Sequence, residues 1–367
     1  ILEKRAFIFT SEHERLLRGA VRRFRHHLEP RDLIDDLVDV AQKLTGADRA
    51  AVYLREPGQE TFQLHMMHRQ TLSPDLDARA LRASSLFEKA LSEKSSLFSP
   101  DIQGDRRFKN IAICRHIGPR AVLITPMRGT RDIVGVLYLD IRTGNHEMMA
   151  GNASFIQELV DEAALSLEVS TLYQDLDDSF MSMVRALGTT VDAKDPHTHG
   201  HAARVAEYAL QIGREMGLRA EDLRDLEIGA YLHDIGKIGI AGVILKSRDR
   251  LTEEEMEAIR HHPEIGTRIL SPIRKLSKVA LAIRQHHERF DGKGYPDQLK
   301  GDEIMLIARI IAVADALDAM TTVRPYQTPM TLSQAVAVIT GNAGTQFDPH
   351  IAAIVNQLFQ RGQLNLA

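Results

Sequence analysis

The sequence predicts a multidomain protein in which an N-terminal α/β domain with an antiparallel sheet is joined by a long connecting helix to a C-terminal all-α domain. Three observations lead to this prediction. The chain has 367 residues, which exceeds the usual size of one domain. Strand-like patterns occur over residues 29–165 and disappear after Thr189. Between the two regions, apolar residues recur at steps of three and four over residues 155–187, which is typical of one long helix.

The composition is that of an ordinary globular protein and excludes several classes. Hydrophobic residues make up 44% and charged residues 26% of the chain, which argues against a disordered protein. The 46 basic and 50 acidic residues give a net charge of -4, which argues against binding polymeric nucleic acid or a membrane surface through bulk positive charge. Cys114 is the single cysteine, so we expect no internal disulfide and predict a reducing, cytoplasmic location.

Segments that target a chain to a membrane or through it are not predicted. The longest apolar stretch, residues 304–320, is interrupted by Arg309, Asp315 and Asp318, so no membrane span is expected. No signal peptide is recognised. The chain begins with Ile1 rather than methionine, as a fragment of a longer protein would.

The elements of the N-terminal region follow in order. Residues 1–28 are basic and predict a lead-in helix with a solvated face rather than a nucleic-acid arm, because no aromatic residues interleave with the charges. The domain itself is predicted over residues 29–168 and begins with a helix over residues 33–44. Four β-rich runs follow, at residues 49–55, 61–68, 121–127 and 133–141. Residues 128–132 predict a hairpin between the last two runs.

The last two β-rich runs resemble a known domain. Residues 121–127 followed by 133–140 are similar to the end of a GAF domain, and the resemblance covers residues 29–168. It implies a sensor domain that binds a regulatory ligand or supports dimerisation, and so biases the connecting helix. A purely structural role is the alternative. No phosphate-binding loop identifies a ligand, and Cys114 is predicted to be a core residue rather than a reactive one.

The connecting helix over residues 155–187 carries an apolar stripe with steps close to a heptad repeat. The stripe consists of Leu165, Val169, Leu172, Leu176, Phe180, Met183 and Leu187. Two interpretations are open, an amphipathic helix packed within its own chain and the seam of a parallel dimer. We favour the seam, and therefore expect a homodimer, because the stripe bridges two domains.

Histidines are concentrated in the C-terminal domain, which is predicted over residues 188–360. Helical spacing places one His or Asp on the inward, apolar face of each of five predicted helices. These residues are His201, His233, His262, His286 and Asp315, and two of them have a neighbour of the same kind, Asp234 and His287. The sequence therefore predicts that imidazoles and carboxylates meet in the interior of the domain.

Such a cluster predicts a metal centre. An unpaired ionisable group away from water costs several kcal/mol, and neutral imidazoles and carboxylates have too few donors to satisfy one another. Divalent cations accept both ligand types. The pairs His233-Asp234 and His286-His287 would let adjacent side chains reach two cations, with an aspartate as the bridge. Two cations about 3.5–4 Å apart support an in-line phosphoryl displacement. No cysteine lies nearby, which excludes a structural zinc knuckle.

Five separated motifs now resemble one family, the HD-GYP phosphodiesterases, over residues 188–360. The motifs are His201, His233-Asp234-Ile235-Gly236-Lys237, His262-Pro263-Glu264-Ile265-Gly266, the run from His286 to Gly294-Tyr295-Pro296, and Asp315. The resemblance implies hydrolysis of the bacterial second messenger cyclic di-GMP to the linear dinucleotide pGpG, and in some members onward to GMP. It also implies two or three divalent metal ions, with iron as the first expectation and manganese or another metal as the alternative.

The resemblance also implies roles for single residues. The implied metal ligands are His201, His233, Asp234, His262, His286, His287 and Asp315, with Asp234 as the bridging and catalytic carboxylate. His197 stands where trinuclear members have a glutamate and is a further candidate ligand. The predicted substrate-binding residues are Lys237, Gly294, Tyr295, Pro296, Arg324, Asp195 and Asp318. Lys237 is also predicted to be catalytic, as a point charge for the phosphate. The loop formed by residues 294–296 would line the guanine pocket or contact a protein partner.

The predicted function is that of a metal-dependent cyclic di-GMP phosphodiesterase with a GAF-like regulatory domain. The main alternative is a catalytically slow cyclic di-GMP receptor that signals through the connecting helix, and a third is another HD-type phosphohydrolase. The complete ligand set favours the enzyme over the receptor, and residues 286–296 argue against the third. Gln327 departs from the family by replacing a basic residue, and His261 and His350 are predicted to be solvated or capping residues.

Overall fold

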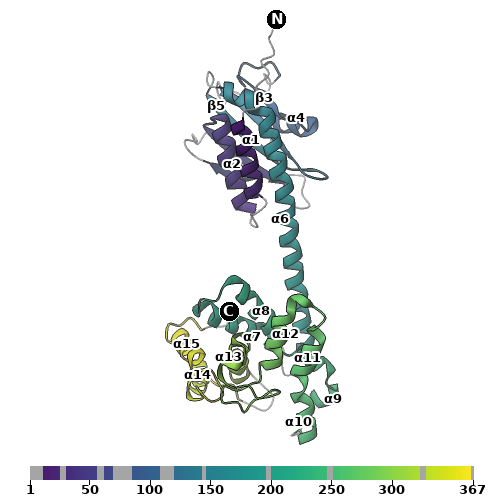
Figure 1. Ribbon diagram of the computed structural model, residues 1–367, viewed down its shortest axis with the longest axis vertical. Helices are drawn as coiled ribbons and strands as arrows, with labels where there is room; N and C mark the ends of the chain where they lie inside the picture. Colours follow the sequence, from purple (N-terminus) through teal and green to yellow (C-terminus); the bar gives the residue numbers. More distant parts are fainter. Residues whose placement is uncertain are drawn as a thin grey trace. The chain divides into compact units, whose positions relative to one another are not determined.

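A computed structural model of the chain describes residues 11–24, 30–55, 62–68, 85–107, 120–142, 146–195, 200–245, 251–322 and 328–364. The chain divides into two compact units, Ile1–Leu176 and Asp177–Ala367. In the ribbon diagram the described strands lie in the first unit and the second unit consists of helices (Figure 1). The predicted fold class is thereby confirmed. Cys114, His197, Arg324 and Gln327 lie outside the described residues.

The first unit is built on an antiparallel sheet of five strands in the order β2-β1-β5-β4-β3. The strands are β1 (Arg49–Arg55), β2 (Phe62–His68), β3 (Leu97–Ser99), β4 (Arg120–Arg128) and β5 (Ile133–Arg142). The backbone N–H of Gly129 donates to the carbonyl of Asp132 (2.9 Å) and closes the predicted hairpin. The sequence did not predict β3, because three residues are too few to show an alternating pattern.

Helices cover both faces of this sheet. They are α1 (Ser11–Phe24), α2 (Pro30–Thr45), α4 (Ser85–Glu93) and the first part of α6 (Glu147–Lys194). Leu123 of β4 lies in one hydrophobic core together with Phe24 of α1 and residues of α2 and α6. The adjacent Val122 and Ile124 lie in a second core with Phe87 of α4. Successive side chains of a strand point to opposite faces, so the sheet is buried on both sides.

The connecting helix α6 has 48 residues and is longer than predicted at both ends. Leu159 is buried in the core of the first unit, and Val191 is buried in the core of the second. Between these two, the side chains of Val169, Leu172 and Leu176 are 66–68% exposed. The central part of α6 therefore presents apolar side chains without burying them in either unit.

The described residues of the second unit form helices joined by turns and loops, with a single bridge between Ala343 and Phe347. Its helices are α7 (His201–Glu215), α8 (Ala220–Leu232), α9 (Gly242–Leu245), α10 (Glu253–Arg260), α11 (His262–Leu270), α12 (Ser277–Gln285), α13 (Leu306–Thr321), α14 (Leu332–Gly341) and α15 (Pro349–Gln360). Three 3-10 turns join them, η1 (Ile235–Gly239), η2 (Arg274–Leu276) and η3 (Gly301–Glu303). Helix α13 packs against α7, α8, α12, α14 and α15 and forms the centre of the unit.

The apolar character of α13 is explained by this central position. Ile310, Ile311 and Leu317 are fully buried among the surrounding helices. In the part of the chain that the structure describes, no helix combines the length and the apolar composition that crossing a membrane requires. The long apolar stretch of the sequence is thus the core of the helical unit.

Candidate metal centre

The predicted ligands lie mostly at helix ends, where adjacent residues can project into one space. His201 and His262 are the first residues of α7 and α11, whereas His233 and His286 directly follow the last residues of α8 and α12. Asp315 lies within α13. The four histidine side chains are buried. Five elements thus bring the predicted residues together in the second unit.

Backbone hydrogen bonds fix the orientation of three of the imidazole rings. The Nδ1 atoms of His233, His262 and His286 lie 2.7, 2.8 and 2.6 Å from the carbonyl oxygens of Ala230, Ile259 and Ile283. A carbonyl oxygen only accepts, so Nδ1 carries the proton in each ring. The other ring nitrogen, Nε2, is then the atom that each of the three rings presents to the cluster, which is the arrangement usual for metal-ligating histidines.

The ligand atoms form two groups, His262–His286–His287 and His201–His233–Asp234, and the atoms within each group lie within 4.8 Å of one another. The Asp234 carboxylate connects the two groups. Its Oδ1 is 3.3 Å from Nε2 of His262, and its Oδ2 is 3.4 Å from Nε2 of His233. Asp315 lies beside the second group, with its Oδ1 3.4 Å from Nε2 of His201.

The protonation states of the first group fit a cation. Burial and neighbouring imidazoles lower the pKa of His286 well below its usual value and that of His287 to about 3, so both rings are neutral. The Nε2 atoms of His262 and His286 are 3.3 Å apart. Since both Nδ1 protons are used on carbonyls, two lone pairs face each other across this distance. Divalent first-row metal ions bind neutral imidazole nitrogen together with carboxylate oxygen, so the donor set fits such ions.

The second group is electrostatically different. Burial alone would lower the pKa of His233, but the Asp234 carboxylate outweighs it and raises the pKa to about 9. Burial would likewise raise the pKa of Asp234, but Lys237 and His233 hold it well below its usual value. The carboxylate is therefore ionised, as a bridging ligand must be.

Asp318 lies behind His201. Its Oδ2 accepts a hydrogen bond from Nδ1 of His201 (2.6 Å), and its Oδ1 accepts bonds from Arg204 Nε (2.5 Å) and Thr322 Oγ1 (3.0 Å). Burial would raise the pKa of Asp318, but the bonds from His201 and Arg204 lower it to about 2. The carboxylate is only 1% exposed. Protein donors thus occupy both oxygens of Asp318, an arrangement suited to orienting the His201 ring, and the predicted substrate contact stays a prediction.

Lys237 lies on η1, directly beside the bridging carboxylate. Its Nζ is 2.7 Å from Oδ2 of Asp234 and 3.4 Å from Oδ2 of Asp195. Burial would lower the pKa of this ammonium, but Asp234 and Asp195 raise it, so Lys237 is positively charged. Lys237 and Asp195 therefore both lie beside the cluster. Asp195 is buried, and its carboxylate contacts Lys237.

The loop formed by residues 294–296 also reaches the cluster. The ring of Tyr295 stacks on His287, with centroids 4.9 Å apart and an interplanar angle of 27°. Glycine is required at position 294, because a Cβ there would lie 2.4 Å from the backbone nitrogen of Arg289. The buried Glu288 carboxylate accepts hydrogen bonds from the backbone N–H groups of Asp297 (2.6 Å) and Leu299 (3.1 Å) and anchors the far side of the loop.

Two cavities meet at His287. The larger has a volume of about 650 Å³ and includes Arg260, Arg289 and Lys293 together with the 294–296 loop. The smaller has a volume of about 340 Å³ and extends along α13 past Asp315. Three basic residues and the two acidic residues Glu257 and Glu264 line the larger cavity. Both cavities open beside ligand residues, so a polar molecule could reach the cluster from this side.

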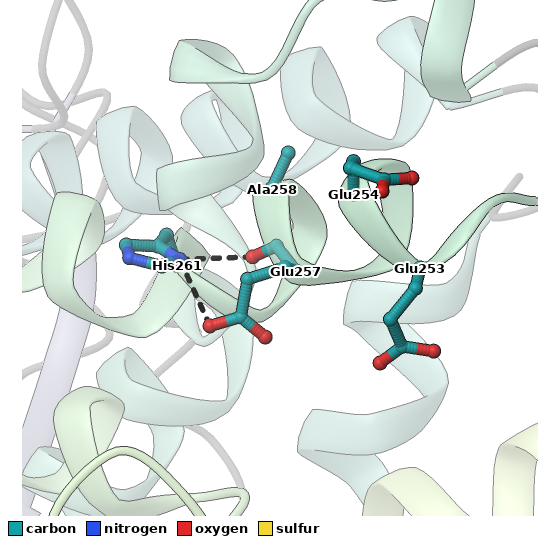
Figure 2. A pocket seen from close by; sticks show the side chains of 5 residues that line it. All are labelled: Glu253, Glu254, Glu257, Ala258 and His261. Carbon is teal, nitrogen blue, oxygen red and sulfur yellow. Dashed lines mark hydrogen bonds and ion pairs between the residues drawn. The ribbon is translucent and has the colours of Figure 1, made fainter.

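Two predicted bystanders are confirmed as such. His261 is 53% exposed at its side chain and donates from Nδ1 to the carbonyl oxygen of Glu257 (2.8 Å), as Figure 2 shows. His350 is exposed at the start of α15. His261 is therefore a useful contrast to its neighbour His262, which has the same side chain but is buried in the cluster.

Sequence reasoning missed Glu288. Its role depends on hydrogen bonds to backbone groups 9 and 11 residues further along the chain. Neither the 3.6-residue period nor the 2-residue period reports such contacts. The adjacency of Glu288 to the His286-His287 pair was the one signal that could have drawn attention to it.

Comparison with known proteins adds family information. Residues 185–351 match the HD domain family, and residues 29–169 match the GAF domain family. The two matched segments correspond to the helical unit and to the unit with the sheet, and the fold of each unit agrees with its match.

Three curated relatives are similar to about half of the chain. The "3'3'-cGAMP-specific phosphodiesterase 3" of Vibrio cholerae is 36% identical over 219 residues, which cover 58% of this chain and 47% of the relative. The cyclic di-GMP phosphodiesterase response regulator RpfG of Xanthomonas campestris is 38% identical over 196 residues (52% of each chain). A "Cyclic di-GMP phosphodiesterase" of Thermotoga maritima is 39% identical over 184 residues (49% of each). The chain spans about half the length of these relatives.

Proposed function

We propose that this chain, which joins a GAF domain to an HD domain, is a metal-dependent phosphodiesterase that hydrolyses a cyclic dinucleotide, with cyclic di-GMP as the substrate. The observation that carries the proposal is the position of the ionised Asp234 carboxylate between two groups of buried imidazoles, with Lys237 beside it. A carboxylate shared by two cation sites, next to a fixed positive charge, suits phosphoryl transfer to water. The names of the three relatives support the same reaction.

Each residue of the centre has a definable task. The cations would be held by His262, His286 and His287 on one side, by His201, His233 and Asp315 on the other, and by Asp234 between them. When bound, a pair of divalent cations neutralises phosphate charge and activates water. Lys237 offsets the negative charge that grows on the phosphate oxygens, and Asp318 keeps Nε2 of His201 turned toward the cluster. Addition of water across one phosphodiester bond gives pGpG, and a second cleavage gives GMP.

The cavity beside the 294–296 loop supports an anionic substrate. Arg260, Arg289 and Lys293 line it together with His287, so positive charge lies next to the cluster. The similarity to a relative named as specific for 3'3'-cGAMP makes that molecule the second candidate substrate. Comparison of kcat/KM for the two cyclic dinucleotides decides between them, and we expect the larger value for cyclic di-GMP.

The decisive experiment removes the shared carboxylate and its neighbour. We expect the double variant His233→Ala/Asp234→Ala to lose both the bound metal and the hydrolysis of cyclic di-GMP. The control is His350→Ala, which removes an exposed histidine that belongs to neither ligand group and should change neither quantity. Full turnover by the double variant would show that the assignment is wrong.

The receptor alternative predicts a different result for the wild-type protein. A receptor would bind cyclic di-GMP and turn it over slowly, whereas the enzyme releases pGpG or GMP over many cycles. The completeness of the ligand set in the described residues supports the enzyme. Elemental analysis of anaerobically purified protein, with iron expected at two or three atoms per chain and manganese as the alternative, measures the cofactor directly.

The exposed stripe on α6 supports a homodimer. Val169, Leu172 and Leu176 follow heptad-like steps and are at least 66% exposed, as the seam of a parallel coiled coil would be in a single chain. We expect Leu172→Glu/Leu176→Glu to halve the mass in solution. Val243→Glu is the matched control, because Val243 is 80% exposed but lies on α9. An unchanged mass for the double variant would contradict the seam.

A further inference from the structure

The last residue of α6 contacts the turn that carries the catalytic lysine. The Nζ atom of Lys194 donates hydrogen bonds to three carbonyl oxygens, those of Lys237 (3.1 Å), Ile238 (2.6 Å) and Ile240 (2.8 Å). An ammonium group has three donors, so this set matches its capacity. The carbonyls of Lys237 and Ile238 belong to η1, the turn that begins immediately after Asp234, and Ile240 directly follows this turn.

The same turn of α6 makes two further contacts with the centre. The carboxylate of Asp195 lies 3.4 Å from Nζ of Lys237, and that of Asp192 accepts a hydrogen bond from the backbone N–H of Ala202 (3.3 Å). Ala202 directly follows His201 at the start of α7. One helical turn therefore holds both the lysine side and the His201 side of the second ligand group.

The turn η1 depends on such support. It has five residues of 3-10 geometry, whose hydrogen bonds are weaker than those of an α-helix. It is also tightly packed, because a Cβ at Gly236 would lie 1.8 Å from the carbonyl oxygen of His262. Movement of η1 would therefore displace Asp234, Lys237 and the backbone of His262 together, and would disturb both ligand groups.

We propose that Lys194 is a positioning residue of the hydrolytic site, which fixes η1 so that Lys237 and Asp234 keep their places. The role rests on the proposed phosphodiesterase function. Helix α6 begins in the GAF domain and ends beside η1, the turn that carries Lys237. A shift or rotation of the last turn of α6 changes the position of Lys237, so α6 has a direct means of setting the rate.

Substitution of Lys194 in the full-length chain tests the role. In Lys194→Met the three carbonyls lose their common donor, and we expect kcat for cyclic di-GMP to fall about tenfold, with KM within about twofold. Lys194→Arg keeps the charge but presents a planar fork instead of three converging donors, so its loss should be intermediate. Arg185→Met is the control, because Arg185 lies on the same helix and pairs with the surface residue Glu227.

Hydrogen exchange of the metal-free protein gives a readout that is independent of activity. We expect the amides of residues 235–240 to exchange about tenfold faster in Lys194→Met than in the wild type, and to be unchanged in Arg185→Met. The two possible failures are distinguishable. Unchanged exchange and unchanged kcat in Lys194→Met would overturn the role of Lys194 alone. A wild-type protein that binds metal but hydrolyses no cyclic dinucleotide would instead overturn the proposed function.

Discussion

Each unit of the molecule buries a polar cluster, and the two clusters are opposites. In the first unit, Asp140 is fully buried and accepts hydrogen bonds from Arg49 Nε (2.8 Å), Arg120 Nε (2.7 Å) and the Tyr138 hydroxyl (2.7 Å). Burial raises the pKa of Tyr138, so its hydroxyl remains a donor. Each of these three donors has Asp140 as its acceptor, and Nη2 of Arg49 forms an ion pair with Oδ2 of Asp140 (2.5 Å), so opposite charges lie side by side. This cluster has what a structural role requires within the protein itself.

In the histidine cluster of the second unit, hydrogen-bond acceptors do not all have donors. The Nε2 atoms of His262 and His286 face each other at 3.3 Å as lone pairs, and burial keeps these rings neutral. Burying polar groups without partners costs free energy, which evolution tolerates where a ligand supplies the missing partner. The contrast shows that burial of polar groups does not by itself indicate function. The informative feature is a mismatch that only a cation resolves.

The largest expected effect comes from breaking the mismatched cluster. In His286→Leu one ligand of the first group is lost, so we expect metal content to fall and hydrolysis of cyclic di-GMP to drop about 10³-fold or more. In urea unfolding, the chelator-treated variant should be only about 1 kcal/mol less stable than the chelator-treated wild type, because the His286 ring makes one backbone hydrogen bond. A large loss of stability without loss of metal would show that the histidine cluster has a structural role instead.

The matched cluster should respond in the opposite way. Asp140→Ala leaves the buried Arg49 without its carboxylate partner. We expect the first unit to lose about 3–5 kcal/mol of unfolding free energy. The metal content should be unchanged. Asp39→Ala is the control, because it breaks an exposed ion pair with Lys43 on α2 and should cost less than about 1 kcal/mol. Equal losses for the two variants would show that burial of the Asp140 cluster contributes little.

Much of the fold could be predicted from the sequence, because hydrophobic periodicity reports which residues face a core. The strands β1, β2, β4 and β5 and the helices α7, α8, α10, α12 and α13 follow from it. The ends of α6 did not, since residues 147–154 and 188–194 hold too few large apolar side chains to show a period. Lys194 illustrates the reason, because its contacts are to backbone carbonyls more than 40 residues away.

The candidate site was predictable to a similar degree. Inward helical spacing brought the imidazoles and carboxylates together, and the structure places His201, His233, His262, His286 and Asp315 in one cluster. What spacing could not provide is the layer behind the ligands. Asp318 follows Asp315 by nearly one turn and shares its helix face, so the sequence does not distinguish a residue that faces substrate from one that orients a neighbouring ring.

The hydrogen bond from His201 to Asp318 gives the next prediction, with a smaller expected effect. Asp318→Asn keeps the shape of the side chain but weakens the hydrogen bond to Nδ1 of His201, so we expect metal affinity to fall about 10–100-fold with the fold intact. Metal titration of the chelator-treated protein measures the affinity. Asp302→Asn is the control, since Asp302 is 91% exposed and pairs only at the surface with Arg309. Wild-type affinity in Asp318→Asn would exclude the orienting role.

The smallest effect is expected at Tyr295, where the contact with the cluster is a stacked ring and not a ligand. Tyr295→Phe keeps the ring on His287, so kcat/KM for cyclic di-GMP should stay within about twofold of the wild type. Tyr295→Ala removes a stacking contact worth about 0.5–1.5 kcal/mol, which corresponds to a loss of roughly 2- to 10-fold. If Phe were as damaging as Ala, the hydroxyl would be the important group. The Tyr295 hydroxyl would then act through a hydrogen bond, as the Tyr138 hydroxyl does in the Asp140 cluster.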